Sequence, residues 1–469
     1  MPSSAYKGQG PSLNRQILAL ALPAFGALIA SPLLVLVDSA LVGHLGSLPL
    51  AGLTLASSLT QTLVGLMVFL AYSTTPAVAR FLGAGRLEDS FRAAKNGLWV
   101  SLGLGLLLAL LLGLTADPLL LALGAQGPVL DAARAYLLPS LLGLPAMLLV
   151  LAATGALRGY QDTRTPLWVA SLGALLNAPL SWALIYPLGW GVAGSALATA
   201  LVQWGMALAL LLALRGRRPV GVSLAPDWAG VLAVFRVGGW LMLRALSIRT
   251  ALLATVLVVT AQGPENLAAY QLTMSCFNLL AYALDALAIA AQALLAKELG
   301  ARDLSDSAQV QAVVGLKNRL VGWSLGFGLV TALACPLIGF GLGPLLSPDG
   351  RVQFLFGLSL LVLGLGQPLA AYVFILDGVL MGAQDTRYLG LASLFNLLVY
   401  LPVLAGLGVW WASGGLATWV EGLPVGLVGE GLDAAVWAYL LLWVAYALVY
   451  MGARGLTLGL RDRSHVWVR

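Results

Sequence analysis

The chain has 469 residues, of which 60% are hydrophobic and only 9% are charged. This composition excludes an ordinary soluble domain and is typical of a polytopic membrane protein, in which apolar stretches of about 20 residues cross the bilayer as helices. The formal net charge of +6 does not indicate nucleic-acid binding, because the positive residues flank the apolar stretches and membrane topology explains them.

Twelve apolar stretches follow one another along the chain, separated by charged residues or by glycine and proline. They predict an all-α membrane protein with twelve transmembrane helices. The predicted helices span residues 16–42, 50–80, 94–115, 132–157, 166–186, 191–214, 234–261, 266–297, 315–342, 352–382, 387–410 and 434–460.

Charge separates the loops into two groups. Loops that follow even-numbered helices are rich in lysine and arginine, and both ends of the chain are basic as well. Loops that follow odd-numbered helices hold few positive residues and several acids. By the positive-inside rule, we expect a multi-pass protein of the cell inner (plasma) membrane with both termini in the cytoplasm.

The two halves of the chain repeat. LGAGRL at residues 82–87 corresponds to LGARDL at 299–304, and RGYQDTR, ending at Arg164, corresponds to MGAQDTR, ending at Arg387. The repeat predicts two pseudo-symmetric six-helix lobes, a plan that recurs in transporters. The expected organisation is an N-terminal lobe at residues 1–214, a cytoplasmic linker at 215–230 and a C-terminal lobe at 231–469.

Three of the 19 acidic residues lie well inside predicted helices: Asp38, Asp285 and Asp377. Insertion scales assign a cost of roughly 2.5–3.5 kcal/mol to an ionised aspartate at the membrane centre, and removal from water favours the neutral carboxyl group. Such a group can exchange a proton or hold a cation, as ion-coupled transport requires. The alternative for each is a structural ion pair, with Arg244 and Arg249 of the seventh predicted helix as available partners.

Asp38 has the setting most typical of a functional acid. Pro23 and Pro32 precede it in the same predicted helix, and an internal proline removes a helix hydrogen bond and favours a kink. We therefore expect a kink at Pro32 and a helix that bends when Asp38 changes its charge.

Polar side chains of the fifth and sixth predicted helices are candidates for the same site. Asn177 and Ser181 are four residues apart and share one helix face. Together with Thr199 of the next helix and Asp38, they are predicted to form a polar pocket in the first lobe. The alternative is ordinary interhelical hydrogen bonding, worth about 0.6 kcal/mol per bond.

Four segments carry a family resemblance: LALALPAFGALIASPLLVLVDSALVGHLG at residues 18–46, MLRAL at 242–246, AYALDALAIAAQALLAKELGARD at 281–303 and FILDGVLMGAQDTR at 374–387. Through them the chain resembles the multidrug and toxin extrusion family, and specifically its DinF-like branch. The resemblance implies two lobes around a V-shaped central cavity. It also implies secondary active export of cationic or amphipathic organic compounds, in exchange for protons or sodium, by alternating access.

The resemblance also implies roles for single residues. The acid of the first helix, here Asp38, is central to coupling in the family, and Asn177 and Thr199 match two further positions of the first-lobe site. Ser181 stands where family members have a second aspartate. This difference favours protons as the coupling ion, with sodium at Asp38, Asn177 and Thr199 as the alternative.

The second lobe holds further candidates by resemblance. Asp377 matches an acid that sodium-coupled members use, whereas Asp285 and Arg244 resemble features of the DinF-like branch. Whether these residues take part in coupling or have a structural role is open at this point.

Other functional classes fit the sequence less well. None of the lysines lies in a P-loop context, which argues against an ATP-driven pump. Two cysteines and two histidines supply neither a metal site nor a catalytic set, so we expect no enzyme activity, no cofactor and no bound metal. The expected partners are small organic substrates and the lipid bilayer, without nucleic acid, and the expected state is a monomer.

One alternative function stays open. A flippase for lipid-linked oligosaccharide or another amphipathic lipid would need a more cationic cavity, and Arg244 and Arg249 are candidates to supply it.

Overall fold

The computed structural model describes residues 13–422 and 432–468, and the elements in this part of the chain are helices. The first lobe contains α1 (Leu13–Gly43), α2 (Ser47–Leu66), α3 (Phe69–Gly83), α4 (Leu87–Leu114), α5 (Ala116–Ala122), α6 (Pro128–Leu141), α7 (Leu144–Gly159), α8 (Arg164–Ile185) and α9 (Gly191–Arg215). The second contains α10 (Trp228–Ala261), α11 (Pro264–Ala301), α12 (Ser307–Leu346), α13 (Gly350–Gly382), α14 (Thr386–Ala412), α15 (Gly415–Glu421), α16 (Ala434–Val444), a π-helix (Ala445–Tyr450), α17 (Met451–Arg463) and a 3-10 turn (Val466–Val468).

Twelve membrane spans are confirmed when one bent pair counts as a single span. Among the described residues, 11 helical segments are long and apolar enough to cross a membrane, and the pair α6 and α7, bent by 49°, makes the number 12. The bend falls at residues 142–143, between Pro139 and Pro145. Each of these prolines lacks the N–H that a continuous helix would use there.

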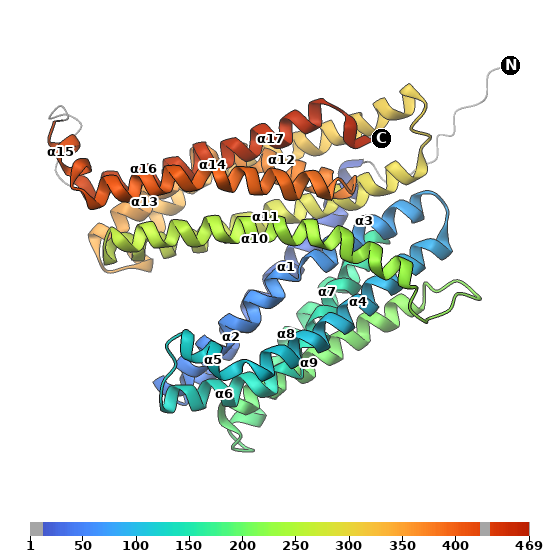
Figure 1. Cartoon of the computed structure of the whole chain (residues 1–469), viewed down its shortest axis with the longest axis horizontal. Helices are drawn as coiled ribbons and strands as arrows, with labels where there is room; N and C mark the ends of the chain where they lie inside the picture. Colours follow the sequence, from blue (N-terminus) through green and yellow to red (C-terminus); the bar gives the residue numbers. More distant parts are fainter. Residues whose placement is uncertain (1–12, 423–431, 469) are drawn as a thin grey trace.

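The helices form two groups that diverge from a common end (Figure 1). The groups lie far apart at the end that carries α5 and α15, and they meet where α3 and α11 end. At this common end Gln161 Nε2 donates to the Ala293 carbonyl (3.0 Å), and Gln292 Nε2 donates to the Tyr72 carbonyl (2.7 Å). These two hydrogen bonds join the lobes here, and each lobe supplies the donor of one of them.

Two turns of the same geometry mark the repeat. Gln161 after α7 and Gln384 after α13 have left-handed backbones, with φ 64° and 61°. Asp162 and Asp385, the next residues, bond their N–H groups to the carbonyls of Leu157 and Leu380 at 2.9 and 3.0 Å. The N–H groups of Gln161 and Gln384 donate to the carbonyls of Arg158 and Met381. The two kinds of bond together form the Schellman arrangement that ends many helices.

Besides the bent pair α6 and α7, two further spans depart from the continuous helices that the sequence predicts. The second is interrupted at residues 67–68, between α2 and α3. The last contains the π-helical turn Ala445–Tyr450, an insertion that widens a helix locally. Aromatic packing accompanies this turn, because the rings of Tyr446 and Tyr450 lie 6.5 and 5.0 Å from the ring of Tyr400. Long-range packing of this kind is not visible in a hydrophobicity pattern.

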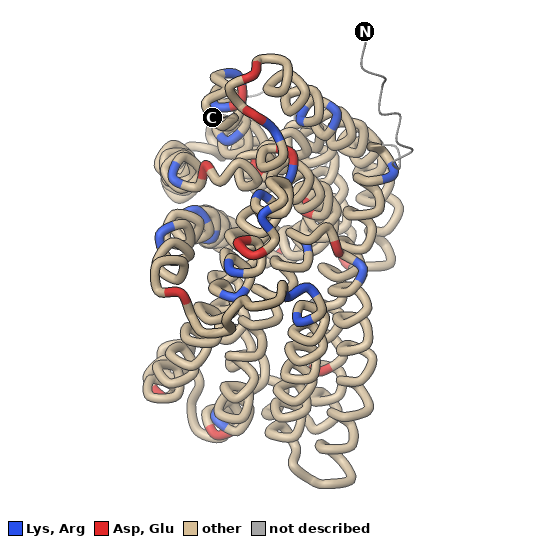
Figure 2. Tube along the Cα trace, turned by 90° about the vertical axis from the view of Figure 1, so that its right-hand side faces the viewer, with Lys and Arg blue, Asp and Glu red and all other residues tan. Residues whose placement is uncertain are grey.

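Residues 216–227 connect α9 and α10. α9 ends at Arg215 and α10 begins at Trp228, and this connection lies within the predicted linker at 215–230. The linker lies against α4, where Lys95 Nζ donates to the Ser223 carbonyl (3.0 Å) and Trp99 Nε1 donates to the Leu224 carbonyl (2.9 Å). Figure 2 looks onto the end of the molecule that carries the linker and the C-terminus, and lysines and arginines are spread over it.

Candidate functional site

Asp38 lies on α1 in the interior of the first lobe, with only 3% of its surface exposed. Ser181 Oγ donates to Asp38 Oδ1 at 3.1 Å, and Thr199 Oγ1 donates to Asp38 Oδ2 at 2.8 Å. Both carboxylate oxygens therefore have a hydroxyl donor, which offsets part of the cost of burying the group. α1 continues without a break past Pro23 and Pro32, so bending at Pro32 stays a prediction about the transport cycle.

α8 and α9 bring the predicted polar residues to Asp38. Asn177 and Ser181 are one turn apart on α8 and fully buried, and Thr199 faces them from α9. Asn177 Nδ2 donates to Thr199 Oγ1 (3.0 Å), and Ser181 Oγ lies 3.4 Å from Asn177 Oδ1. The four first-lobe residues predicted from the sequence thus lie together in one buried hydrogen-bonded cluster.

Ser195 is a further member of this cluster that was not identified from the sequence. It lies one turn before Thr199 on α9 and is fully buried. Its hydroxyl approaches Asp38 but makes no hydrogen bond to any described residue. The four-residue spacing between Ser195 and Thr199 would have indicated it, because it places both side chains on one face of the helix.

Asp377 on α13 is held by two arginines in the second lobe. The residue is 4% exposed, and its side chain accepts hydrogen bonds from Arg244 of α10, at 2.8 Å, and from Arg454 of α17. Arg454 was not identified from the sequence, although it is a charged residue in an apolar helix. Asp377 therefore forms the structural ion pair that the sequence left open as an alternative, and Arg244 is one of its partners.

Asp285 on α11 has a different environment. Its side chain is half-buried and makes no hydrogen bond or ion pair with another described residue. The charged groups that influence it include Arg244, Arg454 and Arg158. The neighbouring Ala286 packs against helices of the first lobe. Asp285 thus lies near the boundary between the lobes, apart from the Asp38 cluster. It does not share the ion pairs that hold Asp377.

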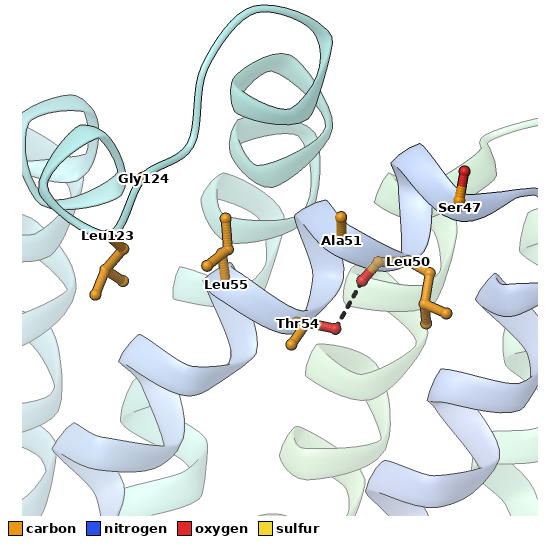
Figure 3. A pocket seen from close by; sticks show the side chains of 7 residues that line it. All are labelled: Ser47, Leu50, Ala51, Thr54, Leu55, Leu123 and Gly124. Atoms are coloured by element: carbon orange, nitrogen blue, oxygen red, sulfur yellow. Dashed lines mark hydrogen bonds between the residues drawn. The ribbon is translucent and has the colours of Figure 1, made fainter. Parts of the chain in front are cut away.

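Arg249, the second predicted partner for a buried acid, pairs with none of the three. It has no ion pair within the described part of the chain, and its side chain is exposed. It lines a pocket of about 450 Å³ together with residues of α1 and α2. A second pocket, of about 530 Å³, lies beside α2 and is lined mainly by apolar side chains (Figure 3).

The donor set around Asp38 contains a single carboxylate. Among the described residues, no cluster of three or more histidine, cysteine, aspartate or glutamate side chains suits a metal ion. The cluster can hold a proton on Asp38, and its side-chain oxygens are the ligands that a sodium ion would have there. Binding of either ion at this site stays a prediction.

The MatE family model matches residues 23–183 and 241–405, more than half of the chain. The chain belongs to the MatE family. The DNA damage-inducible protein F of Escherichia coli is 31% identical over 91% of this chain and 92% of its own length. The probable multidrug resistance protein NorM of Deinococcus radiodurans is 30% identical over 89% of this chain and 93% of its own. The Vibrio cholerae MATE transporter VcmN in its bent form shares the fold, with a TM-score of 0.80 and 21% identity over 97% of this chain and 98% of that one.

MatE membership confirms the resemblance to multidrug and toxin extrusion transporters and defines the broad activity. Proteins of this family are efflux transporters that handle small organic compounds, so this chain is a multi-pass membrane transporter. Asp38, Asn177 and Ser181 lie inside the first matched segment, and Asp285 and Asp377 lie inside the second. Thr199 and Arg454 complete the two clusters from outside the matched segments.

Proposed function

We propose that this MatE transporter exports cationic or amphipathic organic compounds in exchange for protons that bind at Asp38. The observation that carries the proposal is the burial of Asp38 between the hydroxyls of Ser181 and Thr199. An intramembrane carboxylate held inside a helix bundle is typical of residues on proton and ion pathways.

The composition of the cluster supports protons over sodium. It contains one carboxylate, and Ser181 occupies the position that resemblance assigns to a second acid. Asn177, Ser181, Thr199 and Asp38 also bond to one another, so no cation is needed to satisfy their polar atoms. Sodium at Asp38, Asn177 and Thr199 is the alternative, and separately imposed proton and sodium gradients distinguish the two ions.

Protonation supplies the coupling step in this proposal. A neutral carboxyl group no longer attracts two hydroxyl donors as strongly as a carboxylate does, so Ser181 and Thr199 reorient and α1 shifts against α8 and α9. α1 bends at Pro32, where its hydrogen-bond ladder is weakened. A ligand shifts a two-state equilibrium only by its differential affinity for the two states, so the proton and the exported compound must favour opposite orientations of the lobes.

The orientation in the membrane is part of the proposal. The lobes meet at the end that carries the basic loops (Figure 1, Figure 2), and the positive-inside rule puts this end in the cytoplasm of the plasma membrane. Both termini are then cytoplasmic, and a monomer is sufficient because one chain contains both lobes.

The test is ethidium efflux from proteoliposomes with a proton gradient or a sodium gradient imposed one at a time. Proton-driven efflux by the unmodified protein and its loss in Asp38→Asn are expected, with Asp131→Asn as a control at an exposed acid on α6. Size-exclusion profiles must show that each variant is folded. Undiminished proton-driven efflux by Asp38→Asn contradicts the proposed role. Efflux driven by a sodium gradient alone would show that sodium, and not the proton, is the coupling ion.

The flippase alternative has one specific observation in its favour: Arg249 lines a pocket between the lobes and forms no ion pair with any acid among the described residues. Translocation of a fluorescent isoprenoid phosphate in the same proteoliposomes, without efflux of organic dyes, would favour it over the proposed drug export.

A further inference from the structure

A polar pocket between the lobes lies outside the Asp38 cluster. One wall is the face of α2 that carries Thr54, Ser57 and Gln61, a second is Ser39 on α1, and Arg249 reaches the pocket from α10 of the other lobe. None of the described residues that line it is acidic. Because both lobes contribute to its lining, a compound bound there contacts both halves of the transporter.

Arg249 is the only charged residue among those that line the pocket in the described part of the chain. Its guanidinium lies against Gly65 of α2, where a Cβ atom would be 3.0 Å from its Nη2 atom. The glycine therefore leaves room for the arginine to approach the first lobe. An arginine within a membrane helix is costly unless it faces a partner or a cavity. Arg249 faces the pocket and makes no ion pair in the part of the chain that the structure describes.

The hydroxyl groups on α2 complement this charge. Thr54 Oγ1 donates to the Leu50 carbonyl at 2.8 Å, and Ser58 Oγ donates to the Leu55 carbonyl at 2.7 Å. Their oxygens keep lone pairs that can accept hydrogen bonds from a ligand. The pocket thus offers one permanent cation beside several acceptors, which suits a compound that carries an anionic group next to N–H or O–H donors.

An apolar pocket adjoins the polar one. Leu50, Leu55 and Leu123 line it, and Thr54 lines both pockets (Figure 3). Small-molecule sites typically combine an apolar surface with a few polar groups that fix orientation. An amphipathic compound can therefore place its charged end at Arg249 and its apolar part along α2.

We propose that Arg249 and the polar face of α2 form a subsite for the anionic group of exported compounds, which extends the substrate class to amphipathic organic anions and zwitterions. The assignment rests on the proposed export function, but binding at this subsite requires neither an ion gradient nor Asp38. A guanidinium recognises a carboxylate or sulfonate through two parallel hydrogen bonds.

The experiment compares two dyes that differ only at one carboxyl group. Rhodamine 110 has a free carboxylate and rhodamine 123 is its methyl ester, and fluorescence polarisation measures the affinity of each for the purified protein without a gradient. Arg249→Gln is expected to weaken rhodamine 110 binding about tenfold, in line with loss of a charge-assisted bidentate contact, and to change rhodamine 123 binding less than about twofold. The affinity of Arg249→Lys for rhodamine 110 is expected to lie between those of the unmodified protein and Arg249→Gln.

Two further variants separate the subsite from general effects. Arg236→Gln removes an exposed arginine from the same helix that does not line the pocket, and it should leave both affinities unchanged. Gly65→Ala keeps the charge but displaces the guanidinium. It should therefore weaken binding of rhodamine 110 more than binding of rhodamine 123. The proposal is overturned if Arg249→Gln loses affinity equally for both dyes or for neither. It is also overturned if the unmodified protein does not bind rhodamine 110.

A competition experiment distinguishes soluble anions from lipids. Displacement of rhodamine 110 by farnesyl phosphate, with the same Arg249 dependence and at lower concentration than by any soluble carboxylate tested, assigns the pocket to a lipid headgroup and overturns the assignment to exported compounds. Absence of gradient-driven dye efflux is a separate result that contradicts the proposed function and leaves the binding comparison intact.

Discussion

Gly83 of α3 and Gly300 of α11 face each other's helices where the two lobes meet. A Cβ atom on Gly83 would overlap the carbonyl of Lys297, and a Cβ atom on Gly300 would overlap the carbonyl of Arg80. The two glycines occupy equivalent positions in LGAGRL and LGARDL. The repeat therefore places one glycine from each lobe in a single close helix crossing, which exists only while the lobes are together at this end.

Gly83→Ala should force this end of the molecule apart. The obstacle is a backbone carbonyl of the other lobe, so no side chain can move aside, and overpacking of this kind costs about 1–3 kcal/mol. Spin labels at Ala84→Cys and Ala301→Cys, in a background without Cys276 and Cys335, should show longer distances by double electron–electron resonance. Gly103→Ala is the matched control, because a Cβ there meets nothing within 4 Å. Unchanged distances in Gly83→Ala would show that the crossing tolerates a side chain.

Asp377→Asn should destabilise the second lobe. It leaves Arg244 and Arg454 without their shared carboxylate, and removal of one partner from a buried ion pair costs about 3–5 kcal/mol. The thermal unfolding midpoint in detergent should fall markedly, whereas Asp285→Asn, which breaks no ion pair with a described residue, should change it little. If Asp377→Asn keeps its stability and loses only proton-driven efflux, Asp377 has a coupling role and not a structural one.

Thr199→Val should impair transport more than Thr199→Ser. Valine has nearly the shape of threonine but removes the donor to Asp38 and the acceptor for Asn177, and an unsatisfied buried polar group costs about 1–3 kcal/mol. The rate of proton-driven ethidium efflux at equal protein density is the measurement. Equal rates for the two variants would mean that the hydroxyl has no part in coupling.

Arg134→Gln should change how stability depends on pH at the end that carries α5. Hydrogen bonds from Arg134 hold the pKa of Asp117 below its usual 3.8. Because the folded-state pKa is the lower one, the stabilisation is present above the unfolded-state pKa and is lost as the pH falls through the folded-state value. The unfolding midpoint of Arg134→Gln should therefore depend less on pH below about 4. The pair is exposed and screened by salt, so the difference should shrink at high ionic strength. A pH profile identical to that of the unmodified protein would contradict the pairing.

The sequence by itself indicated the membrane helices, the two lobes and the first-lobe cluster except for Ser195. Apolar stretches long enough to cross a bilayer can hardly adopt another structure there, because every backbone polar group must be satisfied within the segment. The repeat of LGAGRL and QDTR then indicates two similar lobes. Asp38, Asn177 and Ser181 were identifiable because a polar residue in an apolar helix is rare and the four-residue spacing defines one face.

Only the tertiary structure decided which charged residues meet. Arg244 and Arg249 lie five residues apart on α10, yet one binds Asp377 and the other faces a pocket toward the opposite lobe. The crossing of Gly83 and Gly300 likewise depends on how the lobes pack. These relationships join side chains that are distant in sequence, whereas hydrophobicity and charge patterns report only the local environment of each helix, so the partners of a buried charge follow from packing and not from pattern.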